Sequence, residues 1–230
     1  MFSKKLLMRK HATDEIIFIT PRYTVDSEGN AICTHSFSLE NVFDESTSIE
    51  DYGMHYAFYR CTGITGSISF PELTSINSSG LNYAFYGCTG ITSVSFPELT
   101  SIGSNGLAYA FQNCTGITGS VSFPKLTSIN SSGLRNAFSG CTRITSVSFP
   151  KLTSIGSDVM YNAFYGCKGI TSVSFPKLTS INSSGLNYAF QNCTGITELH
   201  FRSDAQSTVE AATGYSTNFG ATNATIYFDL

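Results

Sequence analysis

Residues 83–102 read YAFYGCTGITSVSFPELTSI, and near copies of this stretch follow one another along most of the 230-residue chain. Six copies carry a cysteine at the same place, and the successive spacings are 27, 26, 27, 26 and 26 residues. These residues are Cys61, Cys88, Cys114, Cys141, Cys167 and Cys193. A period of roughly 20–50 residues is typical of a solenoid, a propeller or an array.

The apolar residues within one period predict a strand, a turn and a short helix. Residues 94–96 alternate between apolar and polar, which predicts a half-buried strand, and Pro97 ends it because proline cannot donate to a sheet ladder. In 107–114, apolar residues recur at i, i+3, i+4 and i+7, the spacing of one helix face, and Ser104-Asn105 offers a helix cap.

One such unit cannot bury its own apolar face, so we expect the units to stack and to shield one another. The two periods of 27 residues each contain an added glycine, Gly66 or Gly119, just before the strand. Glycine suits a residue that must bulge outward without moving the strand, so both positions predict a β-bulge.

The spacing Ile91-x-x-Val94-x-Phe96 and the phrase Ala-Phe-x-x-Cys, followed by an aliphatic residue three positions later, resemble the BspA-like class of bacterial leucine-rich repeats. The resemblance covers roughly residues 43–201. It implies an α/β solenoid, a right-handed superhelix with a parallel β-sheet on the concave face, short helices on the other side and capped ends. It also implies a surface adhesin or host-contact protein.

We expect three segments: an N-terminal tail and cap at 1–42, repeats of 26–27 residues at 43–201, and a C-terminal cap at 202–230. A degenerate copy of the repeat occupies 43–58, and Cys33 extends the cysteine column. Before it, 15–20 and 31–33 predict strands around a turn near 27–30.

The C-terminal segment predicts a helix and a strand. Asp204 is a candidate cap for a helix running to about Thr213 with Gly214 as its stop, and 225–228 predicts a final strand. This segment also resembles the tail of repeat proteins carried by gut-bacterial prophages. A phage or prophage tail-associated receptor-binding protein is therefore the alternative to a bacterial surface protein.

The charge and hydropathy patterns favour neither nucleic acid nor membrane insertion. The net charge is −3, only 13% of residues are charged, and no run of 18 apolar residues occurs. The first 15 residues begin like a secretory signal but lack its apolar core of about seven residues. We expect the protein to be extracellular, on a cell surface or part of a virion. If it is exported, either its leader has been trimmed or it leaves the cell by another route.

The cysteines, histidines and glycines predict neither an enzyme nor a cofactor site. The cysteines come once per period on the apolar face, so we interpret them as buried free thiols, with disulfides between coils as the alternative. The four histidines, His11, His35, His55 and His200, form no known catalytic spacing, and Cys33 with His35 is the one conceivable nucleophile pair. No phosphate-binding glycine loop is present.

Two sets of repeated residues are candidates for a binding surface. The outward strand positions form either a solvated face or a shallow platform for a glycan or a protein, and they are Ser69, Ser95, Ser122, Ser148 and Ser174. The tyrosines of the predicted helix side either bind a ligand or pack between coils, and they are Tyr59, Tyr83, Tyr86, Tyr109, Tyr161 and Tyr165.

A third column is charged and changes sign along the axis. It runs from acidic to basic through Glu72, Glu98, Lys125, Lys151 and Lys177. The column either orients a partner or keeps the solenoid soluble, and we favour solubility. The sequence thus predicts a non-catalytic, monomeric binding module for a protein or a glycan on a cell surface.

Overall fold

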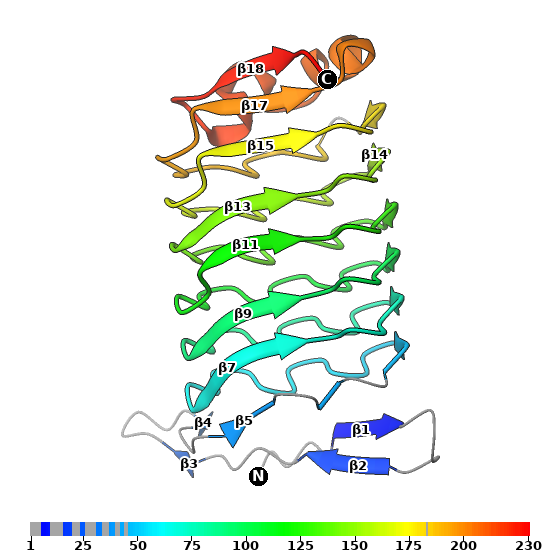
Figure 1. Cartoon of the computed structure of the whole chain (residues 1–230), viewed down its shortest axis with the longest axis vertical. Helices are drawn as coiled ribbons and strands as arrows, with labels where there is room; N and C mark the ends of the chain where they lie inside the picture. Colours follow the sequence, from blue (N-terminus) through cyan, green and yellow to red (C-terminus); the bar gives the residue numbers. More distant parts are fainter. Residues whose placement is uncertain are drawn as a thin grey trace.

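The chain folds into a parallel-strand β-solenoid of about seven turns, stacked along one axis (Figure 1). The structure is a computed structural model that describes residues 6–9, 16–19, 24–25, 31–33, 37–39, 42–43, 46–182 and 184–230. The stacking of near-identical coils confirms the fold class predicted from the period.

Each coil contributes one main strand, of two to six residues, to the sheet at the front of Figure 1. These strands are β5 (Phe37–Ser38), β7 (Ile64–Ser69), β9 (Ile91–Ser95), β11 (Gly119–Ser122), β13 (Ile144–Ser148), β15 (Ser172–Phe175), β17 (Glu198–Phe201) and β18 (Thr225–Phe228). All pair in parallel, in the orders β5-β7-β9 and β11-β13-β15-β17-β18, so the ladder is interrupted between β9 and β11.

A second ladder of two-residue strands follows the proline turn of each coil, along the edge where Figure 1 labels β14. These strands are β6 (Ser48–Ile49), β8 (Ser75–Ile76), β10 (Ser101–Ile102), β12 (Ser128–Ile129), β14 (Ser154–Ile155) and β16 (Ser180–Ile181). Threonine hydroxyls add bonds between coils just before these strands: Thr74 Oγ1 donates to the Thr47 carbonyl at 3.0 Å, and Thr100 Oγ1 to that of Thr74 at 2.9 Å.

Both predicted bulges are confirmed. The register of β7 with β9 shifts between Gly66 and Ser67, and that of β11 with β13 shifts between Gly119 and Ser120. The glycines have φ of +83° and +76°, in the left-handed region that glycine occupies without a steric penalty.

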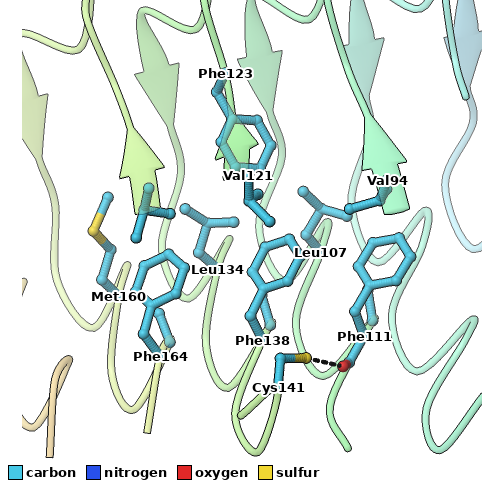
Figure 2. Close-up of a cluster of buried hydrophobic side chains, with 14 of the residues drawn as sticks. Val94, Leu107, Phe111, Val121, Phe123, Leu134, Phe138, Cys141, Met160 and Phe164 are labelled. Carbon is cyan, nitrogen blue, oxygen red and sulfur yellow. Dashed lines mark hydrogen bonds between the residues drawn. The ribbon is translucent and has the colours of Figure 1, made fainter. Parts of the chain in front are cut away.

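Two phenylalanine columns fill the core, one from the strand ends and one from the opposite side of each coil. Figure 2 shows Phe111, Phe138 and Phe164 of the second column and Phe123 of the first. Phe85 stacks on Phe111 at 5.2 Å and Phe111 on Phe138 at 5.4 Å, with interplanar angles of 6° and 9°. Phe123 meets Phe138 edge-on at 6.3 Å, which locks the two columns together. Each buried ring stabilises the fold by about 1.5–3 kcal/mol relative to an exposed one.

The short helix predicted in each coil is wrong, and overlapping turns replace it. In 105–114, backbone donors alternate: Ala108 N bonds to Asn105 O within the coil, whereas Leu107 N bonds to Gly133 O of the next coil. Every fourth residue is left-handed, as at Asn105 (φ 55°) and Tyr109 (φ 58°). The predicted cap residue Asn105 is therefore the first of these left-handed residues.

Competition for the backbone donors explains the difference. A helix would use every donor within its own segment, but here half of the donors join adjacent coils, so the stack gains hydrogen bonds on this side as well. The apolar spacing was read correctly, since Leu107, Ala110, Phe111 and Cys114 are all buried.

The N-terminal strands pair differently from the coils. β1 (Leu6–Arg9) pairs antiparallel with β2 (Ile16–Ile19), and β3 (Thr24–Val25) with β4 (Ala31–Ile32). The strands predicted at 15–20 and 31–33 are therefore confirmed, while the turn between the latter and β3 lies outside the described residues. The degenerate repeat at 43–58 forms a coil of the stack, since Phe43 stacks on Phe70 at 4.5 Å and Ile49 pairs with Ile76.

The C-terminal segment closes the stack above the last coil in Figure 1. It contains η1 (Ser203–Ala205), α1 (Gln206–Glu210), η2 (Tyr215–Gly220) and the predicted strand β18. The helix is shorter than predicted and Asp204 does not cap it, because the Asp204 carboxylate pairs with Arg202 instead. Gly214 is not the stop of this helix, because α1 ends at Glu210 with Ala211 as its C-cap; Gly214 is left-handed at φ +93° and directly precedes η2.

Candidate functional site

The cysteine column is structural. Five thiols, from Cys88 to Cys193, donate to a phenylalanine carbonyl of the preceding coil. Cys114 Sγ donates to Phe85 O at 3.0 Å, and Cys141 Sγ donates to Phe111 O at 3.1 Å, the bond drawn in Figure 2. Burial raises the pKa of Cys141 to about 12, so its thiol stays protonated. The cysteines are buried and free, as predicted, and the His35 of the conceivable pair lies outside the described residues.

The predicted serine column lies on the outward face of the main strands. Ser95 and Ser122 are exposed, and Ser69, Ser148 and Ser174 are half-buried. In the neighbouring column Ser93 Oγ donates to Ser67 Oγ at 2.8 Å, so hydroxyls on this face also satisfy one another. This bonding fits a solvated structural face as well as a ligand platform.

The tyrosines lie on the other side of the core, on the turn segments, and the structure brings four of the six predicted ones into ring contact with one another: Tyr59, Tyr83, Tyr86 and Tyr109. The rings of Tyr56, Tyr83 and Tyr109 stack in consecutive coils, with centroids 4.7 and 4.4 Å apart and interplanar angles of 7° and 4°. Tyr59 and Tyr86 form a parallel second stack at 4.9 Å. Part of the prediction that rings pack between coils therefore holds, although these rings remain partly exposed.

A cation continues this surface where the stack ends. Asn136 takes the next place in the tyrosine column, and beside it the Arg135 guanidinium lies over the Tyr161 ring, 4.4 Å from its centroid. Arg135 Nε also donates to the Tyr109 hydroxyl at 3.4 Å. Tyr161 then meets Tyr188 at 5.8 Å and 87°. We call the whole surface the tyrosine strip, comprising Tyr56, Tyr59, Tyr83, Tyr86, Tyr109, Arg135, Tyr161, Tyr165 and Tyr188.

The main tyrosine column stands at a backbone position that disfavours tyrosine. Tyr56, Tyr83, Tyr109 and Tyr188 have φ between 55° and 58°, in the left-handed region. A bulky residue is a rare outlier there, whereas asparagine is several-fold enriched. The same column holds Asn136 and Asn162 in the same conformation, at 52° and 53°. The backbone alone therefore favours asparagine throughout, and the tyrosine side chain must supply the reason for its presence.

Hydrogen bonds orient the phenols of the strip. Asn113 Nδ2 donates to the Tyr86 hydroxyl oxygen at 3.4 Å, and Asn192 Nδ2 donates to that of Tyr165 at 2.8 Å. A phenol that accepts such a bond keeps its own O–H for another partner. Burial, then the neighbouring phenols of Tyr109 and Tyr56, raise the pKa of Tyr83 to about 12, so the strip is uncharged there at neutral pH.

The stacking decides which ligand chemistry the strip offers. A ring in a parallel stack covers the negative faces of its neighbours and presents its positive edge and its hydroxyl. With Arg135, the surface is therefore rich in donors and suits oxygen acceptors of a ligand. Tyr56, Tyr188 and Arg135 were not among the predicted binding residues, although Tyr56 and Tyr188 share a column of the repeat with Tyr83.

The charged column joins neighbouring coils at one step. Lys125 pairs with Glu98 of the preceding coil, at the point where the column changes sign, and both side chains are exposed. An exposed pair of this kind contributes little to stability, about 0–1 kcal/mol.

A small polar cluster ends the serine column at the C-terminal cap. His200 replaces serine there, stacks on Tyr227 at 5.0 Å, and bonds through Nδ1 to Asp229 at 3.0 Å. The Asp229 bond, and then Glu198 near Nε2, raise the pKa of His200 against an opposing effect of burial. Among the described residues, no cluster of three or more histidine, cysteine or acidic residues is arranged to hold a metal ion.

The comparisons with known proteins concern this repeat region. The sequence profile of the BspA type leucine rich repeat region, six copies, matches residues 54–162 and 107–223. No curated protein matches the chain. In the part of the chain that the structure describes, no helix has the length and apolar character needed to span a membrane.

Three solved structures are similar in part. A T. pallidum leucine rich repeat protein is 20% identical, with 77% of this chain and 78% of that chain covered and a TM-score of 0.45. A leucine rich cell surface protein from Faecalibacterium prausnitzii is 17% identical, with 75% and 67% covered and a TM-score of 0.26. A leucine-rich repeat protein from Bacteroides ovatus is 15% identical, with 89% and 74% covered and a TM-score of 0.21.

Proposed function

Because the chain belongs to the BspA-type leucine-rich-repeat family, we propose that it is a non-catalytic binding module that recognises a protein or a glycan on a cell surface. The recognition surface is the tyrosine strip. The observation that carries this proposal is the occurrence of Tyr56, Tyr83, Tyr109 and Tyr188 at left-handed positions that Asn136 and Asn162 occupy in sister coils.

The energetic cost of these tyrosines supports a role beyond folding. A left-handed residue other than glycine or asparagine costs roughly 1–2 kcal/mol, and a stacked aromatic pair returns about 0.5–1.5 kcal/mol beyond its burial. Stacking alone therefore only offsets the strain. Tyr188 meets Tyr161 edge-on, at 87°, a contact of similar value, and 42% of the residue stays exposed. Strained residues that persist in this way concentrate at ligand-binding surfaces.

The composition of the strip also supports recognition. Tyrosine combined with serine, glycine and asparagine supplies rigid contact area and adaptable hydrogen bonds at low entropic cost, as in antibody binding loops. We place the protein outside the cell or on a cell surface, and we propose that it works as a monomer. Light scattering of the purified chain tests the monomer directly, since a larger mass would contradict it.

Asparagine substitution gives a test that spares the backbone. The triple variant Tyr56→Asn, Tyr83→Asn, Tyr109→Asn removes the stack but keeps a residue that sister coils carry at this place. The matched control is Ser95→Ala, Ser122→Ala, Ser148→Ala on the opposite face. Binding of each fluorescently labelled protein to bacterial and host cells is measured by flow cytometry, with a glycan array and a protein pull-down to separate the ligand classes.

We expect the tyrosine variant to lose at least about tenfold in binding and the serine variant to bind like the unchanged protein. Tenfold corresponds to about 1.4 kcal/mol, roughly the loss of one good aromatic contact. Equal binding by the tyrosine variant, with loss in the serine variant, would move the site to the sheet face and overturn the proposal.

A further inference from the structure

A pocket of about 230 Å³ lies where the last coil meets the C-terminal cap. The last coil supplies one wall, through Tyr188, Gln191, Asn192, Cys193 and Thr194. The cap supplies the other, through Thr217, Gly220, Thr222 and Asn223. The pocket adjoins the C-terminal end of the tyrosine strip, because Tyr188 belongs to both.

The lining carries no charge, and more of its surface is apolar than polar. Three amide side chains, Gln191, Asn192 and Asn223, offer both donors and acceptors, and the threonine hydroxyls of the lining do the same. Burial raises the pKa of Cys193 to about 12, so this thiol is neutral too. A charged ligand would lose its hydration without gaining an ionic partner, whereas a ligand bearing several hydroxyl groups can pair each of them.

Tyr188 gives the pocket an aromatic surface that the stacked tyrosines lack. Its ring is perpendicular to Tyr161, at 87°, and 42% of the residue is exposed. A ring outside a parallel stack can offer its face, with its negative quadrupole, to the weakly positive C–H groups of a ligand. Tyr188 is also left-handed, at φ 55°, a backbone conformation that is unfavourable for tyrosine.

The wall on the cap side is rigidly built from strained backbone. Asn218 and Phe219 are left-handed at φ 48° and 53°, and Gly220 follows at +93°. A Cβ at Gly220 would lie 2.6 Å from Gln191 Cα, so only glycine permits this approach of the two walls. Phe219 is buried, its carbonyl accepts from Phe190 N at 3.0 Å, and Asn218 Nδ2 donates to Ala224 O at 2.6 Å.

These observations together define the ligand class: we infer that the pocket between the last coil and the cap binds a single neutral sugar residue of a glycan. Its sugar ring packs on Tyr188, and its hydroxyl groups pair with the amides and threonines of the lining. The volume lies below the roughly 300–1,000 Å³ of pockets for larger molecules, which limits the site to one ring. The inference rests on the proposed function, because the sugar in the pocket is one part of the ligand and the rest of that ligand contacts the tyrosine strip.

Saturation-transfer NMR on the full-length chain tests the inference with defined probes. The neutral probes are the methyl glycosides of glucose, galactose, mannose, fucose and N-acetylglucosamine, and the charged probes are methyl glucuronide and methyl sialoside. Two variants report on the pocket: Tyr188→Asn, which takes the residue of sister coils, and Thr222→Val, which keeps the shape and removes one hydroxyl. Ser95→Ala is the control, because Ser95 is exposed on the sheet face, outside both the strip and the pocket.

We expect at least one neutral glycoside to bind, and its affinity to fall at least tenfold in Tyr188→Asn and several-fold in Thr222→Val, with no change in Ser95→Ala. Three results would overturn the inference: stronger binding of a charged sugar, no binding of any neutral one, or binding by both pocket variants as tight as that of the unchanged protein. Cell binding measured on these variants and on the triple asparagine variant of the strip separates the two proposals. A protein that binds cells through the strip but ignores these sugars refutes the pocket and leaves the proposed function standing.

Discussion

Adding a single methyl group at Gly116 tests how closely successive coils approach one another. A Cβ on this residue would lie 2.3 Å from Thr89 O and 2.6 Å from Ile91 O, both backbone atoms of the preceding coil. Real Cβ atoms essentially never approach closer than 3.0 Å, so the two coils must separate by at least the difference of about 0.7 Å. Neither oxygen can rotate away, since both belong to the backbone.

The magnitude follows from the clash and the lost coil contact. Overpacking of a tight site costs typically 1–3 kcal/mol, and separation of the coils also weakens the nearby Thr118 N to Thr92 O bond of 3.0 Å, worth about 1 kcal/mol. Replacement of glycine by alanine returns about 0.4–1 kcal/mol by restricting the unfolded chain. We therefore expect Gly116→Ala to destabilise the fold by about 1–3 kcal/mol.

Gly156→Ala is the matched control. The nearest atom to a Cβ there is Val159 Cγ2 at 3.5 Å, an ordinary contact, and sister coils carry Asn130 and Asn182 at this place. This variant should be neutral or gain up to about 1 kcal/mol. Urea unfolding is followed by circular dichroism for both variants. Equal midpoints for Gly116→Ala and Gly156→Ala would refute the close backbone approach of neighbouring coils.

Three further outcomes are expected. A thiol reagent at pH 8 should leave the cysteines that are buried in the native protein, such as Cys141, unmodified and label them in 6 M guanidinium, because burial raises their pKa; rapid native labelling would contradict this. Since the Asp229 bond raises the pKa of His200, the stabilisation is complete below the unfolded pKa of about 6.5 and is lost as the pH rises through the higher folded value. From pH 6 to pH 8.5, the urea midpoint of the unchanged chain should therefore decrease more than the midpoint of His200→Gln. Parallel pH profiles of the two proteins would contradict this prediction. Phe138→Ala should cost about 3–5 kcal/mol in urea unfolding and Phe138→Leu much less, because Phe138 is buried between Phe111 and Phe164; similar losses would argue against a packed column.

The period was enough to predict the buried columns, because stacking places equivalent residues against one another whatever the local backbone does. Phe85, Phe111 and Phe138 follow one another in space as they do in the repeat. Gly66 and Gly119 were predicted as bulges from the extra residue alone, and both adopt the conformation that a bulge needs.

The helix prediction failed because two structures share one apolar spacing. Residues at i, i+3, i+4 and i+7 face the core in a helix and also in overlapping turns with a left-handed residue at every fourth position. The difference depends on whether backbone donors find a neighbouring coil, which a single period does not contain. The column Gly87, Asn113, Gly140, Gly166 and Asn192 held the missing signal, because it is made of residues that tolerate the left-handed region.

The candidate site was predicted as columns and not as contacts. Sequence alone placed Tyr83 and Tyr109 in one column, but their parallel stacking, and the bridge from Arg135 to Tyr161, depend on how far apart the coils lie. The pocket beside Tyr188 was missed altogether, since its second wall belongs to the cap, whose sequence does not repeat.

Hydroxyl-radical footprinting of the protein bound to cells tests most directly whether the tyrosine strip is the recognition surface. Mass spectrometry reads the oxidation of each tyrosine, and the chain supplies reporters on both faces: Tyr56 and Tyr188 on the strip, 40% and 42% exposed, and Tyr227 on the sheet side, 38% exposed. Binding should protect Tyr56 and Tyr188 and leave Tyr227 oxidised as in the free protein. Protection of Tyr227 with unchanged oxidation of both strip tyrosines would contradict the account.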